Sequence, residues 1–208
     1  MKTGHVTGLD LACSMLYGTL HFNSTLFSLH HLQKIDLSDN DFNFSHISSR
    51  FGHFSNLTLL NLNYSIFAGQ VSSEITHLSK LVSLDLSEND YLSLEPSSLV
   101  EISSSICELR FLQVLNLSNN SFSGSMPLCL GNFSNMLLVL HLGTNNLQGT
   151  IPLTFSNDNS LEYLNLNGNE LEGKISQSII NCTMLEFLHL GNNKIEDPFP
   201  CFMKRFHS

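Results

Sequence analysis

A short pattern of apolar and polar positions recurs eight times along the chain. In residues 161–169, leucines at 164 and 166 alternate with polar residues, which is the period of a strand with one buried face. The second apolar residue of this strand falls at Leu11, Leu37, Leu62, Leu86, Leu117, Leu142, Leu166 and Leu190. All steps between these leucines are 24 to 26 residues, except the 31 residues from Leu86 to Leu117. A recurrence of this length predicts a repeat protein.

An asparagine stands three residues after most of these leucines. Its amide group can both donate and accept hydrogen bonds, and a buried amide without partners would cost about 1–3 kcal/mol. We therefore predict a column of structural asparagines, each bonded to the backbone of a neighbouring coil. The column consists of Asn40, Asn89, Asn120, Asn145, Asn169 and Asn193. Ser14 and Ser65 take the place of asparagine in the first and third copies.

A further apolar anchor follows two residues after the asparagine position. The anchors are Leu16, Phe42, Phe67, Tyr91, Phe122, Leu147, Leu171 and Ile195. No copy can bury its leucines alone, so the copies must stack and share one core, each buried leucine contributing about 1.5–3 kcal/mol. The pattern predicts an α/β-type repeat solenoid. We expect a right-handed superhelix of about eight repeats, with a parallel β-sheet on its concave face and few or no regular helices.

The domain organisation follows from the same repeat pattern. No linker rich in Pro, Gly or Ser divides the chain, so we expect one solenoid over residues 1–208. The long step predicts an irregular junction near 91–103, either a loop on the convex side or a join between two halves that have lost intervening repeats; we favour the join. Solenoids need polar end caps, and neither end shows one. We therefore expect the chain, uncapped at both ends, to be a fragment of a longer protein.

Composition narrows the partner classes. Nine Lys and Arg against 18 Asp and Glu give a net charge of −9, and no Lys/Arg cluster suggests a nucleic-acid partner. Residues 1–8 lack the apolar segment of a secretory signal. The longest apolar run, residues 136–140, is far shorter than the roughly 18 residues of a spanning helix. We expect no nucleic-acid binding and no membrane contact by this segment.

Two copies carry an extended motif, LxxLxLxxNxLxGxIP. It occurs at residues 111–127, with Met126 in place of Ile, and at residues 137–152. This motif is similar to the plant-type extracellular leucine-rich repeat. Ser72 and Ser176 depart from it, because each stands where the Pro of Ile-Pro would be. Three further stretches resemble plant receptor-like proteins of the disease-resistance type: residues 3–11, 81–86 and 179–183.

The resemblance implies non-enzymatic recognition in defence or developmental signalling. It implies a peptide or protein ligand and a partner receptor kinase, and a place at the extracellular face of the plasma membrane. Because the chain shows neither a signal peptide nor a membrane span, secretion or mis-targeting is an alternative. A soluble inhibitor or decoy, similar to the polygalacturonase-inhibiting proteins of plants, is a second reading. An inactive truncated gene product is a third.

The polar positions of each strand point away from the core and form a candidate ligand-binding face. In the first four copies this face is acidic: Lys34, Asp36, Asp39, Asn61, Tyr64, Asp85 and Glu88. In the last four copies it carries no carboxylate, Lys or Arg: Asn116, His141, Thr144, Tyr163, Asn165, Phe187 and His189. Val139, Tyr163 and Phe187 fall on successive turns, and an exposed aromatic row on a polar sheet suits a binding hot spot.

Catalytic and metal-binding motifs are missing from the sequence. It contains no HExxH, CxxC or GxSxG. His141 and His189 share a column, but two strands separate them by about 9–10 Å, too far for both to bind one zinc ion. We therefore expect no enzymatic activity, no cofactor and no metal.

Several asparagines have Ser or Thr two residues later, which is the acceptor pattern for N-glycans in exported proteins. The candidates are Asn23, Asn43, Asn56, Asn132 and Asn181. Asn132 and Asn181 occupy the same place on the convex side, which makes them the better candidates. A glycan on the predicted sheet would obstruct a partner, so we expect the sequons there to be used least.

The five cysteines divide into three kinds. Cys107 and Cys129 are 22 residues apart, close to one coil, so they could face each other on the convex side and form a disulfide if the chain is exported. Cys182 aligns with a core position and is expected to be a small buried hydrophobe. Cys13 and Cys201 lie in the end repeats and are expected to be odd thiols.

Overall fold

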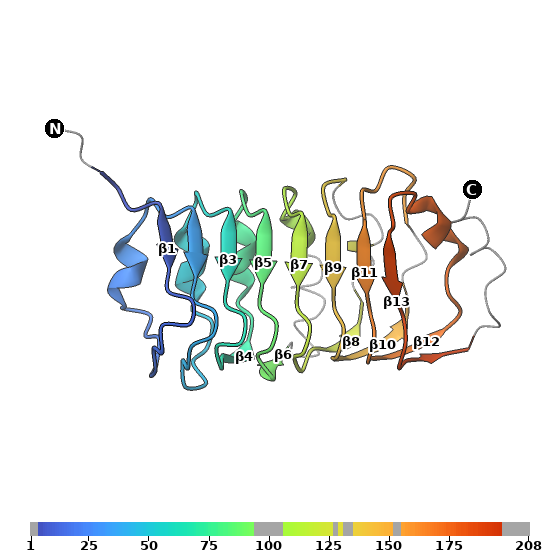
Figure 1. Cartoon of the computed structure of the whole chain (residues 1–208), viewed down its shortest axis with the longest axis horizontal. Coiled ribbons are helices and arrows are strands. Elements are labelled where there is room, and N and C mark those ends of the chain that lie inside the picture. Colours follow the sequence, from blue (N-terminus) through green and yellow to red (C-terminus); the bar gives the residue numbers. More distant parts are fainter. Residues whose placement is uncertain (1–3, 94–105, 127–128, 131–134, 152–154, 197–208) are drawn as a thin grey trace.

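The computed structural model describes residues 4–93, 106–126, 129–130, 135–151 and 155–196. These residues form a solenoid whose coils stack along one axis (Figure 1). Each coil contributes one strand to an eight-stranded, all-parallel sheet, in the order β1-β2-β3-β5-β7-β9-β11-β13. The strands are β1 (Gly8–Asp10), β2 (Lys34–Asp36), β3 (Leu59–Asn61), β5 (Ser83–Asp85), β7 (Val114–Asn116), β9 (Val139–His141), β11 (Tyr163–Asn165) and β13 (Phe187–His189). The predicted solenoid with its parallel sheet is confirmed.

Two smaller parallel sheets follow the asparagine turns, and the sequence pattern did not predict them. They run along the lower edge of the solenoid in Figure 1. One pairs β4 (Ala68–Gln70) with β6 (Tyr91–Ser93). The other has the order β14-β12-β10-β8 and comprises β8 (Ser123–Ser125), β10 (Asn146–Thr150), β12 (Glu170–Gly173) and β14 (Lys194–Ile195). The two sheets are separate between β6 and β8, where the predicted irregular junction falls; most of that junction, residues 94–105, lies outside the described residues.

The side of the solenoid opposite the long sheet carries short 3-10 helices in several coils. They are η1 (Thr25–Ser28), η2 (Ser49–His53), η3 (Ser73–His77), η4 (Ile106–Glu108) and η6 (Gln177–Asn181). The described residues contain no longer helix, as expected. Ser24, Ser48, Ser72 and Ser176 are N-caps, each accepting the backbone N–H two residues later. The two serines that replace the motif proline, Ser72 and Ser176, therefore have a structural role.

The leucines of the eight strands converge on one continuous core. Leu62, Leu142 and Leu166 are all buried. One predicted anchor is wrong: Tyr91 is 60 % exposed, and Leu92 is fully buried in its place. The reason is a tighter turn in the fourth coil, in which the Leu92 N–H donates to the Asn89 carbonyl (2.8 Å) and shifts the inward position by one residue.

The six column asparagines lie one above another between the coils. In a typical coil, Asn169 Nδ2 donates to the carbonyls of Leu142 (3.0 Å) and Leu166 (3.1 Å), and its Oδ1 accepts the Leu147 N–H (3.0 Å). Each asparagine thus joins its own turn to the preceding coil. Asn120 is the exception, because its buried Oδ1 has no hydrogen-bond partner among the described residues. It lies in the coil that follows the shifted anchor.

Candidate functional site

The outward face of the long sheet over β2 to β7 carries a ladder of carboxylates and amides. Asn61 Nδ2 donates to Asp36 Oδ2 (3.0 Å), and Asn116 Nδ2 donates to Asp85 Oδ2 (3.1 Å). The Ser87 hydroxyl donates to the other oxygen of Asp85 (2.6 Å). All donors are neutral, so they hold the carboxylates in place without cancelling their charge. This half of the face is therefore ordered and acidic.

The turn that follows each strand holds four more of the predicted site residues. Asp39, Tyr64, Glu88 and Thr144 share one place in the turn and adopt left-handed backbone, with φ of 54°, 46°, 57° and 54°. Gly168 has the same place and φ 66°. Left-handed backbone is uncommon outside Gly, Asn and Asp, and is unusual for a β-branched residue such as Thr. The recurring Asp, Asn and Gly at this place could have revealed the turn.

The remaining predicted residue of the acidic half is Lys34, which is exposed at the start of β2. Asn119 Nδ2 donates to the Glu88 carboxylate, and the Cys13 thiol donates to Asp39 Oδ2 (2.9 Å). The bond to Asp39 raises the pKa of the exposed Cys13 thiol. Cys13 is free, as expected for an end repeat.

The same face over β9 to β13 is built from rings. Tyr163 and Phe187 stack with their ring centroids 4.6 Å apart and 7° between their planes. His141 meets Tyr163 edge-on at 5.9 Å, and His189 meets Phe187 edge-on at 6.0 Å. The four rings form one patch, which we call the ring patch. Tyr163 is half-buried and Phe187 is 44 % exposed.

Asn165 lies beneath the ring patch and orders it. Its Oδ1 accepts the Asn167 N–H (3.0 Å), which turns Nδ2 toward His141 Nε2 at 2.9 Å and Tyr163 Oη at 3.3 Å. The His141 nitrogen must therefore accept, so the imidazole is neutral with its proton on Nδ1. Desolvation by burial lowers the pKa of His141, although Asp85 and Glu88 oppose that shift. Asn165 is only 8 % exposed, so it positions the rings rather than presenting itself to a partner.

The described residues contain no group of three or more His, Cys, Asp or Glu able to hold a metal ion. Within that part of the chain, no helix is long and apolar enough to cross a membrane.

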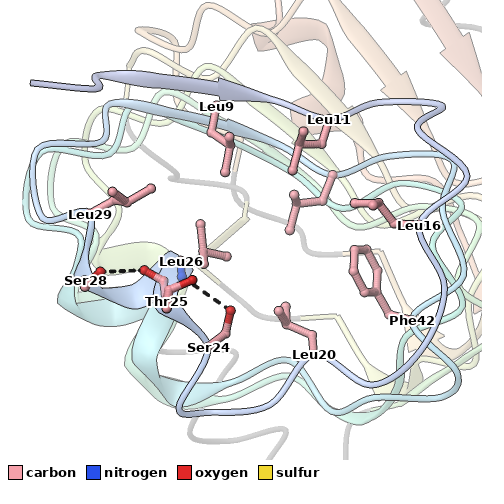
Figure 2. A pocket seen from close by; sticks show the side chains of 11 residues that line it. Leu9, Leu11, Leu16, Leu20, Ser24, Thr25, Leu26, Ser28, Leu29 and Phe42 are labelled. Carbon is pink, nitrogen blue, oxygen red and sulfur yellow. Dashed lines mark hydrogen bonds between the residues drawn. The ribbon is translucent and has the colours of Figure 1, made fainter.

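An apolar cavity of about 410 Å³ lies inside the first coil and continues the core. Figure 2 shows Leu9, Leu11 and Leu26 pointing into it. Two serines that line it form hydrogen bonds within η1. The Ser24 hydroxyl accepts the Leu26 N–H (3.3 Å), and the Ser28 hydroxyl donates to the Thr25 carbonyl (2.6 Å). Most of the lining is leucine, and the cavity lies away from the outward face of the sheet, so we do not assign it to the site.

Cysteines and sequons flank the site. Cys107 and Cys129 form a disulfide with Cα atoms 6.3 Å apart. Cys182 is fully buried, and burial raises the pKa of its thiol to about 11. It is therefore an inert thiol of the core. Cys201 lies outside the described residues.

Among the sequons, Asn23 and Asn43 are exposed. Asn56 is half-buried and accepts a hydrogen bond from Lys80 Nζ (2.7 Å). Asn181 Nδ2, the atom that a glycan would modify, donates to the Phe155 carbonyl (2.8 Å). Asn132 lies outside the described residues. The geometry thus favours Asn23 and Asn43, because modification of Asn181 would break a bond between coils.

Comparison with known proteins gives the repeat its family. Leucine rich repeat family models match residues 135–195, 111–133 and 28–43. Receptor-like protein 6 of Arabidopsis thaliana is 47% identical over 117 residues, 56% of this chain and 11% of that protein. Receptor-like protein Cf-9 of Solanum pimpinellifolium is 38% identical over 135 residues, 65% of this chain and 15% of that protein. The chain spans only 11% to 18% of the length of the first curated relatives it matches.

Solved structures of plant receptors share this solenoid fold. The ectodomain of the Arabidopsis receptor kinase HAESA, in complex with the peptide hormone IDA, is 32% identical, with a TM-score of 0.81 over 91% of this chain and 30% of that chain. A TDR receptor is 24% identical, with a TM-score of 0.79 over 97% of this chain and 37% of that chain, which shows the fold alone. The chain therefore has the leucine-rich-repeat solenoid fold, and it is similar to the repeat ectodomains of plant receptor-like proteins.

Proposed function

We propose that the outward face of the long sheet binds a peptide or protein ligand, as a recognition segment of a plant receptor-like ectodomain. The ring patch carries the proposal. Its stacked rings cross adjacent strands, and Asn165 holds His141 and Tyr163 in fixed orientations. A pre-ordered aromatic surface loses little conformational entropy on binding, which is why Tyr and other rings dominate interface hot spots.

The acidic half of the face complements the ring patch. Asp36 and Asp85 lie on the same sheet as Tyr163 and Phe187. A ligand extended across the strands would meet carboxylates at one end and rings at the other. The carboxylates would disfavour an acidic ligand, while the rings would contribute apolar contact area.

The proposed setting follows from the relatives. HAESA is a receptor kinase whose ectodomain binds the IDA peptide, and with the co-receptor SERK1 it forms a ternary complex. By analogy, we place this chain at the extracellular face of the plasma membrane, in defence or developmental signalling through a partner receptor kinase. This function is non-enzymatic. The Cys107–Cys129 disulfide suits an exported chain.

Calorimetric titration with a panel of plant peptide hormones, beginning with IDA, and with fractionated extracellular fluid would test the proposal. We expect Tyr163→Ala and Phe187→Ala each to weaken binding at least tenfold, the usual effect of losing a hot-spot side chain of about 2 kcal/mol. Phe111→Ala is the matched control, because Phe111 is 56% exposed but lies outside the sheet. Binding that both sheet variants retain in full would contradict the proposal, as would the absence of any binder.

A further inference from the structure

A second exposed surface lies on the turns of coils two to four, off the sheet face. Phe44 is 50% exposed, Ile66 38% and Tyr91 60%. The Phe44 N–H donates to the Ile66 carbonyl (2.9 Å), and the rings of Phe44 and Tyr91 meet edge to face at 5.0 Å. The two rings are therefore in contact, and Ile66 lies on the coil between them. Together with Asp41 and Asp90 we call these three residues the lateral surface.

Coil three allows this contact between coils two and four. It carries the small residues Ala68 and Gly69 in β4, where Ala68 pairs with Tyr91 of β6. A Cβ on Gly69 would come within 2.5 Å of the His46 ring, and its φ of +77° also favours glycine. Phe44 can thus reach across the intervening coil to Tyr91. Tyr91 itself is free to face outward because Leu92 fills the core in its place.

Charge distinguishes the lateral surface from its counterpart in the other half. Asp41, Ile66 and Asp90 hold the same place in successive turns, directly after the column position. Within the described residues, neither carboxylate has a Lys or Arg at salt-bridge distance. In the seventh coil the same place is Glu170, whose carboxylate pairs with Lys194 of the eighth coil at 3.0 Å. At this place a lysine of the eighth coil neutralises the carboxylate of the seventh coil. The carboxylates of the second and fourth coils have no such partner among the described residues.

We propose that the lateral surface binds an extended, polyproline II-like segment of a partner protein that carries Arg or Lys residues among aliphatic side chains. A guanidinium can pair with Asp41 or Asp90 while its plane lies over Phe44 or Tyr91, and aliphatic groups cover Ile66. Asp41 and Asp90 are two coils apart, about 9–10 Å. A chain in the polyproline II conformation rises about 3.1 Å per residue with three residues per turn, so side chains three positions apart lie on the same face about 9 Å apart. The segment therefore carries two basic residues three positions apart.

Charge also disfavours a second copy of this chain as the occupant. The chain has a net charge of −9, so two lateral surfaces would place carboxylates against carboxylates. The lateral surface shares no residue with the ring patch. The inference therefore stands independently of the proposed function.

Fluorescence anisotropy with a labelled synthetic peptide tests the inference. The probe is eight residues long, with two Arg three positions apart and Leu at the other inner positions; the matched probe has Glu for both Arg. We expect the Arg peptide to bind, and Tyr91→Ser to weaken binding at least tenfold. The double variant Asp41→Asn/Asp90→Asn should weaken it as much and remove its salt dependence. Binding should rise as the salt concentration falls.

Two controls separate the sites. Glu172→Gln, exposed in the seventh coil, should leave binding of the Arg peptide unchanged, as should Tyr163→Ala on the ring patch. Loss of hormone binding in Tyr163→Ala with retained Arg-peptide binding would support both proposals separately. Equal affinity for the Glu peptide, or full binding by Tyr91→Ser, would overturn the inference. Sedimentation showing a dimer of the unmodified chain that Tyr91→Ser dissolves would instead assign the surface to a second copy.

Discussion

The helix side of the first four coils and the sheet face of the last four each carry a cluster of aromatic rings, one buried and one partly exposed. In the first half Phe27, Phe51 and Phe54 pack together inside the helix side, with centroids 5.3–6.2 Å apart. In the second half the rings of Tyr163 and Phe187 stack on the outward face of the sheet. The coils stack through their leucines and asparagines. The other positions can therefore differ between the two halves, and they do.

The halves meet at a structural discontinuity. The two smaller parallel sheets are separate between β6 and β8. Near this point the buried Asn120 Oδ1 has no hydrogen-bond partner among the described residues. The Cys107–Cys129 disulfide crosses the coils just after this point. The long sheet pairs β5 with β7 across this point, so the two halves stay joined there by the sheet and by a nearby covalent link.

The largest expected effect comes from the buried rings. Phe51 is fully buried in η2, and Ile179 has the corresponding place in η6. We expect Phe51→Ala to lower the free energy of unfolding by about 3–5 kcal/mol, because it leaves a ring-sized cavity beside two other rings. Ile179→Ala should cost less, about 2–4 kcal/mol. Urea unfolding followed by circular dichroism measures both. A larger loss in Ile179→Ala would break the contrast between an aromatic and an aliphatic core.

The disulfide tests the junction. Replacing Cys107 and Cys129 by Ser should cost about 2–4 kcal/mol, because the 22-residue separation limits the unfolded chain. We also expect the two halves to exchange amide hydrogens with different protection factors in this variant, since repeats couple only through their neighbours. Cys13→Ser, which removes an exposed free thiol, is the control. Unchanged stability in the double variant would show that the coils hold together without the link.

The asparagine column gives the next effect. Asn169→Ala removes the partner of the Leu147 N–H and of the Leu142 and Leu166 carbonyls, and we expect a total loss of about 1–3 kcal/mol. Asn120 accepts no bond at Oδ1, so Asn120→Ala should cost less. Thermal unfolding of the two variants compares an asparagine whose Oδ1 accepts a hydrogen bond with one whose Oδ1 accepts none. Equal losses would mean that the acceptor bond contributes nothing.

These contrasts show what the sequence could reveal. The strands, the core leucines and the stacked asparagines follow from a local period, because every copy must satisfy the same packing and hydrogen-bonding needs. Tyr91 does not follow, because its exposure depends on the tight Asn89–Leu92 turn rather than on its apolar character. The two smaller sheets were missed because their strands, such as Ala68–Gln70 and Ser123–Ser125, show little alternation of apolar and polar residues. Of the candidate face, the sequence indicated the residues, but not that Asn165 lies beneath the rings.

A smaller effect distinguishes two helix caps. Ser72 caps η3 and also donates to the Glu74 carboxylate, which lowers the pKa of Glu74 below its ordinary 4.5. Ser176 caps η6 with no carboxylate in its first turn. Ser72→Ala and Ser176→Ala should each cost about 0.5–2 kcal/mol at neutral pH. A lowered carboxyl pKa stabilises the fold above pH 4.5, and this is lost as pH falls through the folded value.

The cost of Ser72→Ala should therefore shrink below pH 4.5, whereas that of Ser176→Ala should stay constant. Thermal melts of both variants and the unmodified chain between pH 3 and pH 7 measure the difference. Parallel curves for the two variants would show that the Glu74 carboxylate does not support the cap.

The smallest effect belongs to the ring patch. Desolvation lowers the pKa of His141 from 6.5, so the neutral ring stabilises the fold above pH 6.5, and this contribution is lost as pH falls through the lower folded value. His141→Gln keeps an acceptor for Asn165 but cannot titrate. We expect the unmodified chain to lose more stability than His141→Gln between pH 7.5 and pH 5, by less than about 1 kcal/mol because the ring is half-exposed. Asp36→Asn, on the acidic half, should not change this difference. If the unmodified chain and His141→Gln lost stability equally, the Asn165 bond would not depend on a neutral imidazole, and the ordering of the ring patch would rest on stacking alone.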